Sequence, residues 1–426
     1  MSNISFFRQL GWVLVATVAS GACNSAVHLY ARLLGPSEYG LLQAFLQSAV
    51  PQLSIPALGL QVAFVHLMAS VVTAAGERDV AAAVRRVCLV LVALWTAAAV
   101  LVAMNAEALI ATYKLRSAAE LAVLMLTVLV SILQPVFSGI VQGRQDFLWF
   151  GWIMIVTGAG RFIGVGIMIA LFGATAMSAM IGVLFGAALA LSMAAWRSRT
   201  IWMQPAGEFR FAAFLKQVAP LTLAQGAIVF LQSRDGTDAK AALSPEAYGL
   251  YSAAGGIGRA VLYLSAPMIN VMFPRIVREA AQSTRSSVLM QACGASLLVC
   301  GGAALAATLF PELPLRLIQG AKFVDAAPLL PLFSWSLLPL MLANVLVNNL
   351  LARAHYAVVL PLVGVAVGYG VALQHFNSSA GEIILTLGTA ATAALAITLV
   401  FTWREGRRAA RGIVSAGQPS SPVNPA

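Results

Sequence analysis

Two arginines, Arg161 and Arg259, lie deep inside long apolar stretches. Each is roughly 20 Å from the start of its stretch if the chain is helical, at about 1.5 Å per residue. A guanidinium at that membrane depth costs about 3 to over 10 kcal/mol, so it normally faces a wet cavity or a partner. Since its planar fork suits phosphate oxygens, we expect both side chains to line an aqueous cavity and receive an anionic substrate.

The alternative is that these arginines bond backbone carbonyls, hold helices together or reach Asp235 or Asp238 at a helix end. The sequence places all 15 acids in loops, in tails or at segment ends. We therefore expect no acid at the depth of either arginine.

Polar side chains recur at helical spacing around Arg259 and in two other segments. Ser252, Arg259, Tyr263 and Asn270 are spaced by seven, four and seven, which places them on one helix face. Two stripes recur at every fourth position: Asn24, His28 and Arg32, and Gln134, Ser138 and Gln142. We predict Asn24, His28, Arg32, Gln134, Tyr263 and Asn270 as substrate-binding residues beside the two arginines, although such stripes serve equally as hydrogen bonds between helices.

Glycines suggest close helix packing and one hinge. Four pairs have the GxxxG spacing of close helix contacts: Gly139 and Gly143, Gly160 and Gly164, Gly182 and Gly186, and Gly364 and Gly368. Three glycines at 255, 256 and 258 stand beside Arg259 and would weaken a helix there. We therefore expect a hinge at residues 253–258.

The sequence lacks several common catalytic and metal-binding motifs. No phosphate loop of the form GxxxxGK[ST], no GxSxG, no HExxH and no metal-ligand cluster occurs, and the four histidines are dispersed. The four cysteines lie inside apolar runs without zinc-like spacing. We expect no enzyme activity, no cofactor and no metal. The net charge of +11 comes from scattered basic residues and does not indicate nucleic acid.

The elements that position these residues are membrane helices. Sixty per cent of the 426 residues are apolar and 10% are charged, against about 25% charged in soluble domains. Runs near the length of about 20 residues that a spanning helix needs number twelve: 10–33, 39–72, 80–104, 117–141, 149–172, 175–196, 209–232, 246–272, 286–309, 326–352, 356–375 and 382–403. The second run is long enough to break, with Pro51 and Pro56 as its kink.

The basic residues set a topology. With the N-terminus inside, 17 Lys and Arg fall in inside loops and tails and 7 in outside loops, which predicts both termini in the cytoplasm. The longest polar connection divides the chain into six helices plus six. The expected units are a bundle over 1–197, a cytoplasmic linker over 198–208, a second bundle over 209–404 and a basic, then disordered, tail over 405–426.

One sequence motif occurs twice in the chain. LLGPSEYGLLQ spans residues 33–43 and LSPEAYGLYS spans 243–252, and each joins the first two helices of its half. An even number of crossings separates them, which predicts two parallel six-helix bundles related by a pseudo-two-fold axis along the membrane normal, with a central cavity.

Several segments resemble the polysaccharide transporter, or Wzx-type flippase, family. They are ARLLGPSEYGLLQ (31–43), GIVQGRQDFLWFG (139–151), SPEAYGLYSAA through MFPRI (244–276) and LRLIQGAKFVDAAPLLPLFSWSLLPLMLANVLVNNLLA (315–352). The resemblance implies a MATE-like membrane protein of two six-helix bundles. Such a protein flips an undecaprenyl-diphosphate-linked oligosaccharide across the bacterial inner membrane by alternating access. It also implies Asp235 as a possible coupling acid.

The predicted function is therefore flipping of a lipid-linked oligosaccharide for surface polysaccharide biosynthesis. The implied partners are membrane lipid, the anionic diphosphate head of the substrate, and polysaccharide polymerases or glycosyltransferases. Two alternatives remain open: a cation-coupled multidrug exporter of the MATE kind, and a non-transporting scaffold of a polysaccharide assembly complex.

Overall fold

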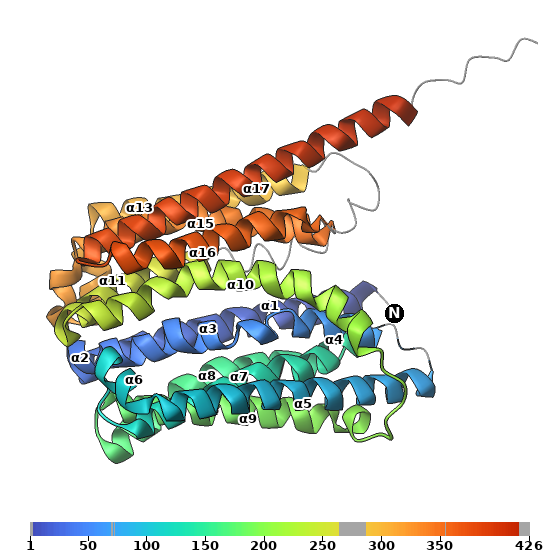
Figure 1. The fold of residues 1–426 in the computed structure, drawn as a ribbon, viewed down its shortest axis with the longest axis horizontal. Coiled ribbons are helices and arrows are strands. Elements are labelled where there is room, and N and C mark those ends of the chain that lie inside the picture. The colour runs from blue at the N-terminus through green and yellow to red at the C-terminus, as the bar shows by residue number, and fades with distance from the viewer. Residues whose placement is uncertain (1–2, 70, 72, 264–286, 354, 417–426) are drawn as a thin grey trace, which may run out of the picture.

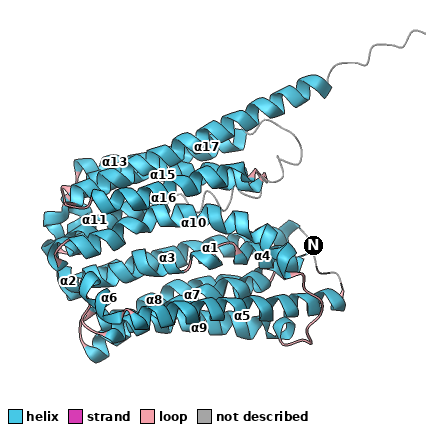
Figure 2. Ribbon diagram, viewed as in Figure 1, coloured by secondary structure: helices cyan, strands magenta, loops and turns pink. Residues whose placement is uncertain are grey.

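The computed structural model describes residues 3–69, 71, 73–263, 287–353 and 355–416, and every regular element in these ranges is helical (Figure 2). Eight of the described helices are long and apolar enough to cross a membrane, or up to ten if two bent pairs are each one span. The chain is thus an all-α membrane protein. The predicted count of twelve spans and the pseudo-two-fold repeat remain predictions, since parts of runs 246–272 and 286–309 lie outside the described residues.

The helices that precede residue 203 form one group. They are α1 (Asn3–Ala26), η1 (Val27–Tyr30), α2 (Ala31–Gln43), the π-helix η2 (Ala44–Ala49), α3 (Val50–Leu53), η3 (Ile55–Ala57), α4 (Leu60–Ala69), α5 (Ala74–Met104), α6 (Ala106–Tyr113), α7 (Ala118–Gly143), α8 (Phe147–Phe172) and α9 (Ala176–Trp202). The helices that follow form the second group: α10 (Phe211–Ala242), α11 (Pro245–Tyr263), α13 (Ser287–Leu309), α14 (Glu312–Ile318), η4 (Ala321–Ala326), α15 (Leu329–Ala352), η5 (Tyr356–Val358), α16 (Val359–His375) and α17 (Ala380–Ala416).

The long helices run roughly side by side, and the N-terminus and the last turns of α17 lie at the same end of the molecule (Figure 1). The start of α11, the labelled α2 and the short α6 lie at the opposite end, which we call the distal end. Helix α10 packs against η2, α3 and η3 of the first group and against α16 and α17 of the second. Within the second group, α10 is therefore a helix that lies at the junction with the first group.

The second predicted run is broken, as its prolines indicate. The chain runs through the π-helix η2 and bends by 53° between Leu53 and Ile55. A separate kink at Gly35, whose φ is 74°, precedes this run. Pro56 lies in the short 3₁₀ turn that follows the bend, because proline lacks the N–H that an uninterrupted helix needs.

Three of the four predicted glycine pairs form close helix contacts. A Cβ on Gly182 would lie 2.5 Å from the backbone of Gly164, and one on Gly160 would lie 3.2 Å from Gly186, so α8 and α9 meet backbone to backbone. Gly139 and Gly143 meet α4 in the same way. The prediction for the fourth pair is wrong: Gly364 and Gly368 on α16 have no atom within 4 Å of an added Cβ among the described residues.

These contacts predict that alanine substitution lowers stability at Gly182 and does not lower it at Gly364. Gly182→Ala should destabilise the protein by about 1–3 kcal/mol, because the added methyl group overlaps backbone that has no side chain to move aside. Gly364→Ala is the matched control and should leave stability unchanged or slightly raised. Thermal unfolding of the two detergent-purified variants measures the difference, and equal melting temperatures would contradict the packing assignment.

Candidate functional site

A buried ion pair joins α10 to α11. The Arg259 guanidinium donates through Nη2 to Asp235 Oδ2, and its Nε donates to the carbonyl of Gln232 at 2.9 Å. The Tyr251 hydroxyl donates to the same Asp235 oxygen at 2.6 Å. Asp235 is 0% exposed and Arg259 is 6% exposed. Each charge therefore compensates the other in a region from which water is excluded.

The arginine also reaches the first helix group. Its Nη1 lies 3.4 Å from Gln47 Oε1 on η2, and its guanidinium carbon lies 5.4 Å from the centroid of the Phe333 ring on α15. An added Cβ on Gly255 would lie 2.6 Å from Arg259 Nη1. Gly255 therefore provides the space that the guanidinium occupies, and α11 is continuous through the predicted hinge in this structure.

The expectation that no acid lies at the depth of Arg259 was wrong. Helix α10 continues to Ala242, ten residues beyond the predicted end of that run, so Asp235 and Asp238 lie within it. Arg234 and Asp238 also pair, with Nε to Oδ2 at 2.7 Å. Two internal ion pairs let a segment as polar as residues 232–240 remain helical inside an apolar protein. The spacing of four between Arg234 and Asp238 was the sequence signal for that pairing.

A second polar network surrounds His28. The Tyr39 hydroxyl and His28 Nδ1 share a hydrogen bond at 2.5 Å, and Gln43 Nε2 lies 3.3 Å from the same nitrogen. Gln319 Nε2 donates to the Tyr39 hydroxyl at 3.2 Å and to the carbonyl of Ala253 at 3.1 Å. Because Gln319 and Ala253 belong to the second helix group, this network ties the two groups together.

The two copies of the repeated motif pack against each other at the distal end. An added Cβ on Gly40 would lie 3.1 Å from Gly249 Cα, and one on Gly249 would lie 2.2 Å from the carbonyl oxygen of Pro36. We call this meeting of Pro36, Gly40 and Gly249 the distal contact. Only glycine lets α2 and α11 approach this closely. The two helix groups are thus closed on each other at this end.

The remaining predicted site residues are distributed over several contacts. Arg32 is exposed and donates to the Leu317 carbonyl, across the two groups, and Asn24 Oδ1 is buried without a hydrogen-bond donor among the described residues. Gln134 donates to Thr157 Oγ1 at 2.9 Å and so links α7 to α8. Arg161 is half-buried on α8. Tyr263 ends α11, and Asn270 lies outside the described residues.

The arrangement can hold an anion only after rearrangement. Every terminal nitrogen of Arg259 has a partner, so an incoming phosphate must displace Asp235, Gln47 or both. We missed Gln47, Gln319 and Tyr251 in the sequence, although Tyr251 lies eight residues before Arg259 on the same helix.

The comparisons with known proteins agree with this architecture. A family described as polysaccharide biosynthesis protein matches residues 11–279, which is more than half of the chain. The chain belongs to this polysaccharide biosynthesis protein family. Among curated proteins, none matches the chain in sequence.

Solved structures show the fold that this polysaccharide biosynthesis protein adopts. An inward-facing multidrug resistance MATE family transporter of the MOP superfamily is 12% identical with a TM-score of 0.75, over 92% of this chain and 96% of that one. The lipid II flippase MurJ in an inward closed conformation is 12% identical with a TM-score of 0.72, over 96% and 93%. An outward-facing MATE transporter is 14% identical with a TM-score of 0.61, over 95% and 96%. The predicted MATE-like fold is confirmed.

The distal contact gives a test of which end is closed. Gly249→Ala should prevent closure, because the new methyl group would meet the Pro36 carbonyl. Position 252 is buried when the distal contact is closed. A Ser252→Cys substitution, made in a variant without the four native cysteines, therefore reports opening of this end. We expect its labelling by a membrane-impermeant maleimide added on the distal side to rise at least tenfold in the Gly249→Ala variant.

Gly21→Ala is the matched control, because an added Cβ there meets no atom within 4 Å. Labelling that stays as slow in Gly249→Ala as in Gly21→Ala would show that the distal contact does not hold the two groups together.

Proposed function

We propose that this protein flips an undecaprenyl-diphosphate-linked oligosaccharide across the bacterial inner membrane, for surface polysaccharide biosynthesis. Both termini would be cytoplasmic, so the distal end would face outward. Family membership and a fold shared with MATE transporters and the lipid II flippase MurJ support a transport function. The observation that carries the proposal is the buried Asp235–Arg259 pair, which contacts both helix groups at their junction.

The distal contact and the comparisons support an inward-facing state. The inward-facing MATE structure has the higher TM-score, 0.75 against 0.61 for the outward-facing one. In this state the substrate head would enter from the cytoplasmic side, between the groups, while its prenyl tail stays in lipid. The chief barrier is removing the diphosphate from water, which is costly unless a cation compensates the charge.

Arg259 would supply that compensation by exchanging partners. A diphosphate offers the fork of the guanidinium several charged oxygens, and Asp235 offers one carboxylate. When Arg259 turns to the substrate, Asp235 would be left as an uncompensated buried charge, at a cost of about 3–5 kcal/mol. We infer that Asp235 then takes up a proton or a cation, which couples substrate binding to an ion gradient.

The other predicted residues enter the proposal in supporting positions. His28 and Arg32 lie at the closed end between the groups, and Arg161, Asn24 and Gln134 lie on α8, α1 and α7. We propose that opening of the distal contact exposes His28 and Arg32 to the sugar. Polymerases or glycosyltransferases would act on the sugar before and after transport and are the expected protein partners.

The role of Arg259 is tested by reconstitution. In proteoliposomes carrying the lipid-linked oligosaccharide, Arg259→Ala should lower the flipping rate at least tenfold, and Arg259→Lys should retain part of it because the charge remains. Asp235→Asn should flip at a rate that no longer responds to imposed proton or sodium gradients. Arg199→Gln, an exposed arginine beside Trp196, is the control for loss of one positive charge.

Two outcomes would decide between functions. Wild-type flipping by Arg259→Ala would refute the phosphate role of this arginine. Efflux of a cationic drug such as ethidium, with no flipping of the lipid-linked oligosaccharide, would favour the multidrug exporter. Absence of both activities in the wild type would favour the scaffold.

A further inference from the structure

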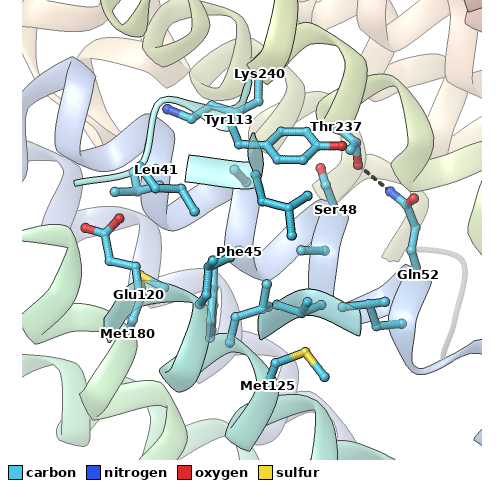
Figure 3. A pocket seen from close by; sticks show the side chains of 18 of the residues that line it. Leu41, Phe45, Ser48, Gln52, Tyr113, Glu120, Met125, Met180, Thr237 and Lys240 are labelled. Atoms are coloured by element: carbon cyan, nitrogen blue, oxygen red, sulfur yellow. Dashed lines mark hydrogen bonds between the residues drawn. The ribbon is translucent and has the colours of Figure 1, made fainter. Parts of the chain in front are cut away.

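A separate cavity of about 270 Å³ lies between α10 and the first helix group. It is lined by neither Asp235, Arg259 nor Gln47, so it is distinct from the ion-pair site. Most of its wall is apolar and includes Leu41, Phe45, Leu121 and Met125 (Figure 3). An apolar wall offers water few hydrogen bonds, so the cavity suits an apolar occupant better than water.

Two opposite charges line this cavity without pairing. The Lys240 side chain is on α10 and the Glu120 side chain is on α7, and each residue is 3% exposed. Among the described residues, the Lys240 ammonium has no hydrogen-bond acceptor and no carboxylate within 4.0 Å; it lies 5.4 Å from the centroid of the Tyr248 ring. Glu120 accepts one hydrogen bond, from the Arg116 backbone N–H at 3.0 Å. Both lie toward the same side of the cavity (Figure 3).

Most of the other charges nearby have contacts of their own, and Glu246 at the start of α11 is exposed. Arg234 also lines the cavity but is paired with Asp238. Lys114 donates to the Leu243 carbonyl, and Arg116 pairs with Glu38. Lys240 and Glu120 are therefore the two cavity charges that lack an ionic partner in the part of the chain that the structure describes.

We infer that this cavity binds a zwitterionic phospholipid. A phosphate group would accept from the Lys240 ammonium, and the amine of the same headgroup would donate to Glu120, so that both buried charges gain partners. A hydrocarbon chain would cover the apolar wall, at roughly 25 cal/mol per Å² of apolar surface removed from water. A purely anionic lipid would meet the like charge of Glu120, and a purely cationic amphiphile would meet that of Lys240.

The C-terminal end of α5 offers such a lipid a route from the hydrocarbon phase of the membrane into the cavity. Val102 lines the cavity, whereas its neighbours Leu101 and Met104 are 61% and 77% exposed. Exposed apolar side chains on a membrane helix contact lipid. This end of α5 therefore has the cavity on one side and the hydrocarbon phase on the other.

Native mass spectrometry of the full-length protein, with phosphatidylethanolamine, phosphatidylglycerol or undecaprenyl phosphate added in turn, tests this inference. The wild type should retain phosphatidylethanolamine in preference to the two anionic lipids. Lys240→Gln and Glu120→Gln should each weaken that retention at least tenfold. Lys216→Gln, exposed on the same helix, and Glu107→Gln, exposed on α6, are the matched controls and should retain the lipid as the wild type does.

A third variant keeps both charges and fills the space. Ala44→Phe should abolish retention of phosphatidylethanolamine while leaving Lys240 and Glu120 in place, so the inference is testable even if a charge variant fails to fold. Tighter retention of phosphatidylglycerol or undecaprenyl phosphate, strengthened further by Glu120→Gln, would replace the inference with an anionic-lipid site. Equal retention of all three lipids by wild type and variants would show that the cavity holds water only.

Discussion

The structure depends on the requirement that a charge inside a membrane protein has a partner. Asp235 and Arg259 satisfy it together, and their pairing fixes α10 against α11 at one relative rotation, since a carboxylate and a guanidinium tolerate little displacement once buried. Tyr251 donates to the same Asp235 oxygen and Gln232 accepts from Arg259, while Asp235 Oδ1 is buried with no hydrogen-bond partner among the described residues. Because Arg259 also reaches Gln47, the same interaction fixes the second helix group against the first. Packing elsewhere follows from this placement of α10 at the junction of the two groups.

Much of the fold was predictable from the sequence because long apolar runs and prolines act locally. The break near Pro56 follows from backbone chemistry that does not depend on distant residues, and the spacing of Gly160 and Gly164 marks a helix face that a second helix can approach closely. Gly364 and Gly368 have the same spacing but no close partner in the part of the chain that the structure describes, because the spacing describes one helix and says nothing about what lies opposite it.

The site was harder to predict for the same reason. The polar segment around Asp235 reads as a helix end unless its partner, Arg259, is known to lie beside it, and that pairing is a property of two helices. Gln134 illustrates the converse, since its spacing was compatible with a cavity lining and the structure gives it Thr157 as a partner. Side-chain type and helical spacing therefore identified polar residues, such as Arg259 and Gln134, whose burial needs a hydrogen-bond or ionic partner. Tertiary structure decided how each cost was offset.

The distal contact has an energetic consequence for a protein that must change shape. Where Gly40 meets Gly249, the atoms in contact are main chain and the Tyr248 ring, and the buried Tyr39 ring packs edge-on against Phe323 across the two groups. The glycines have no side chain to reorder when these surfaces separate, whereas the aromatic rings would become exposed to water. The hydrogen bonds from Gln319 to Tyr39 and from Arg32 to the Leu317 carbonyl also join the groups at that end and would break on opening. Two glycines in register thus bring the helices close enough for aromatic rings to meet across the groups, so the free energy needed to open this end depends on exposing those rings.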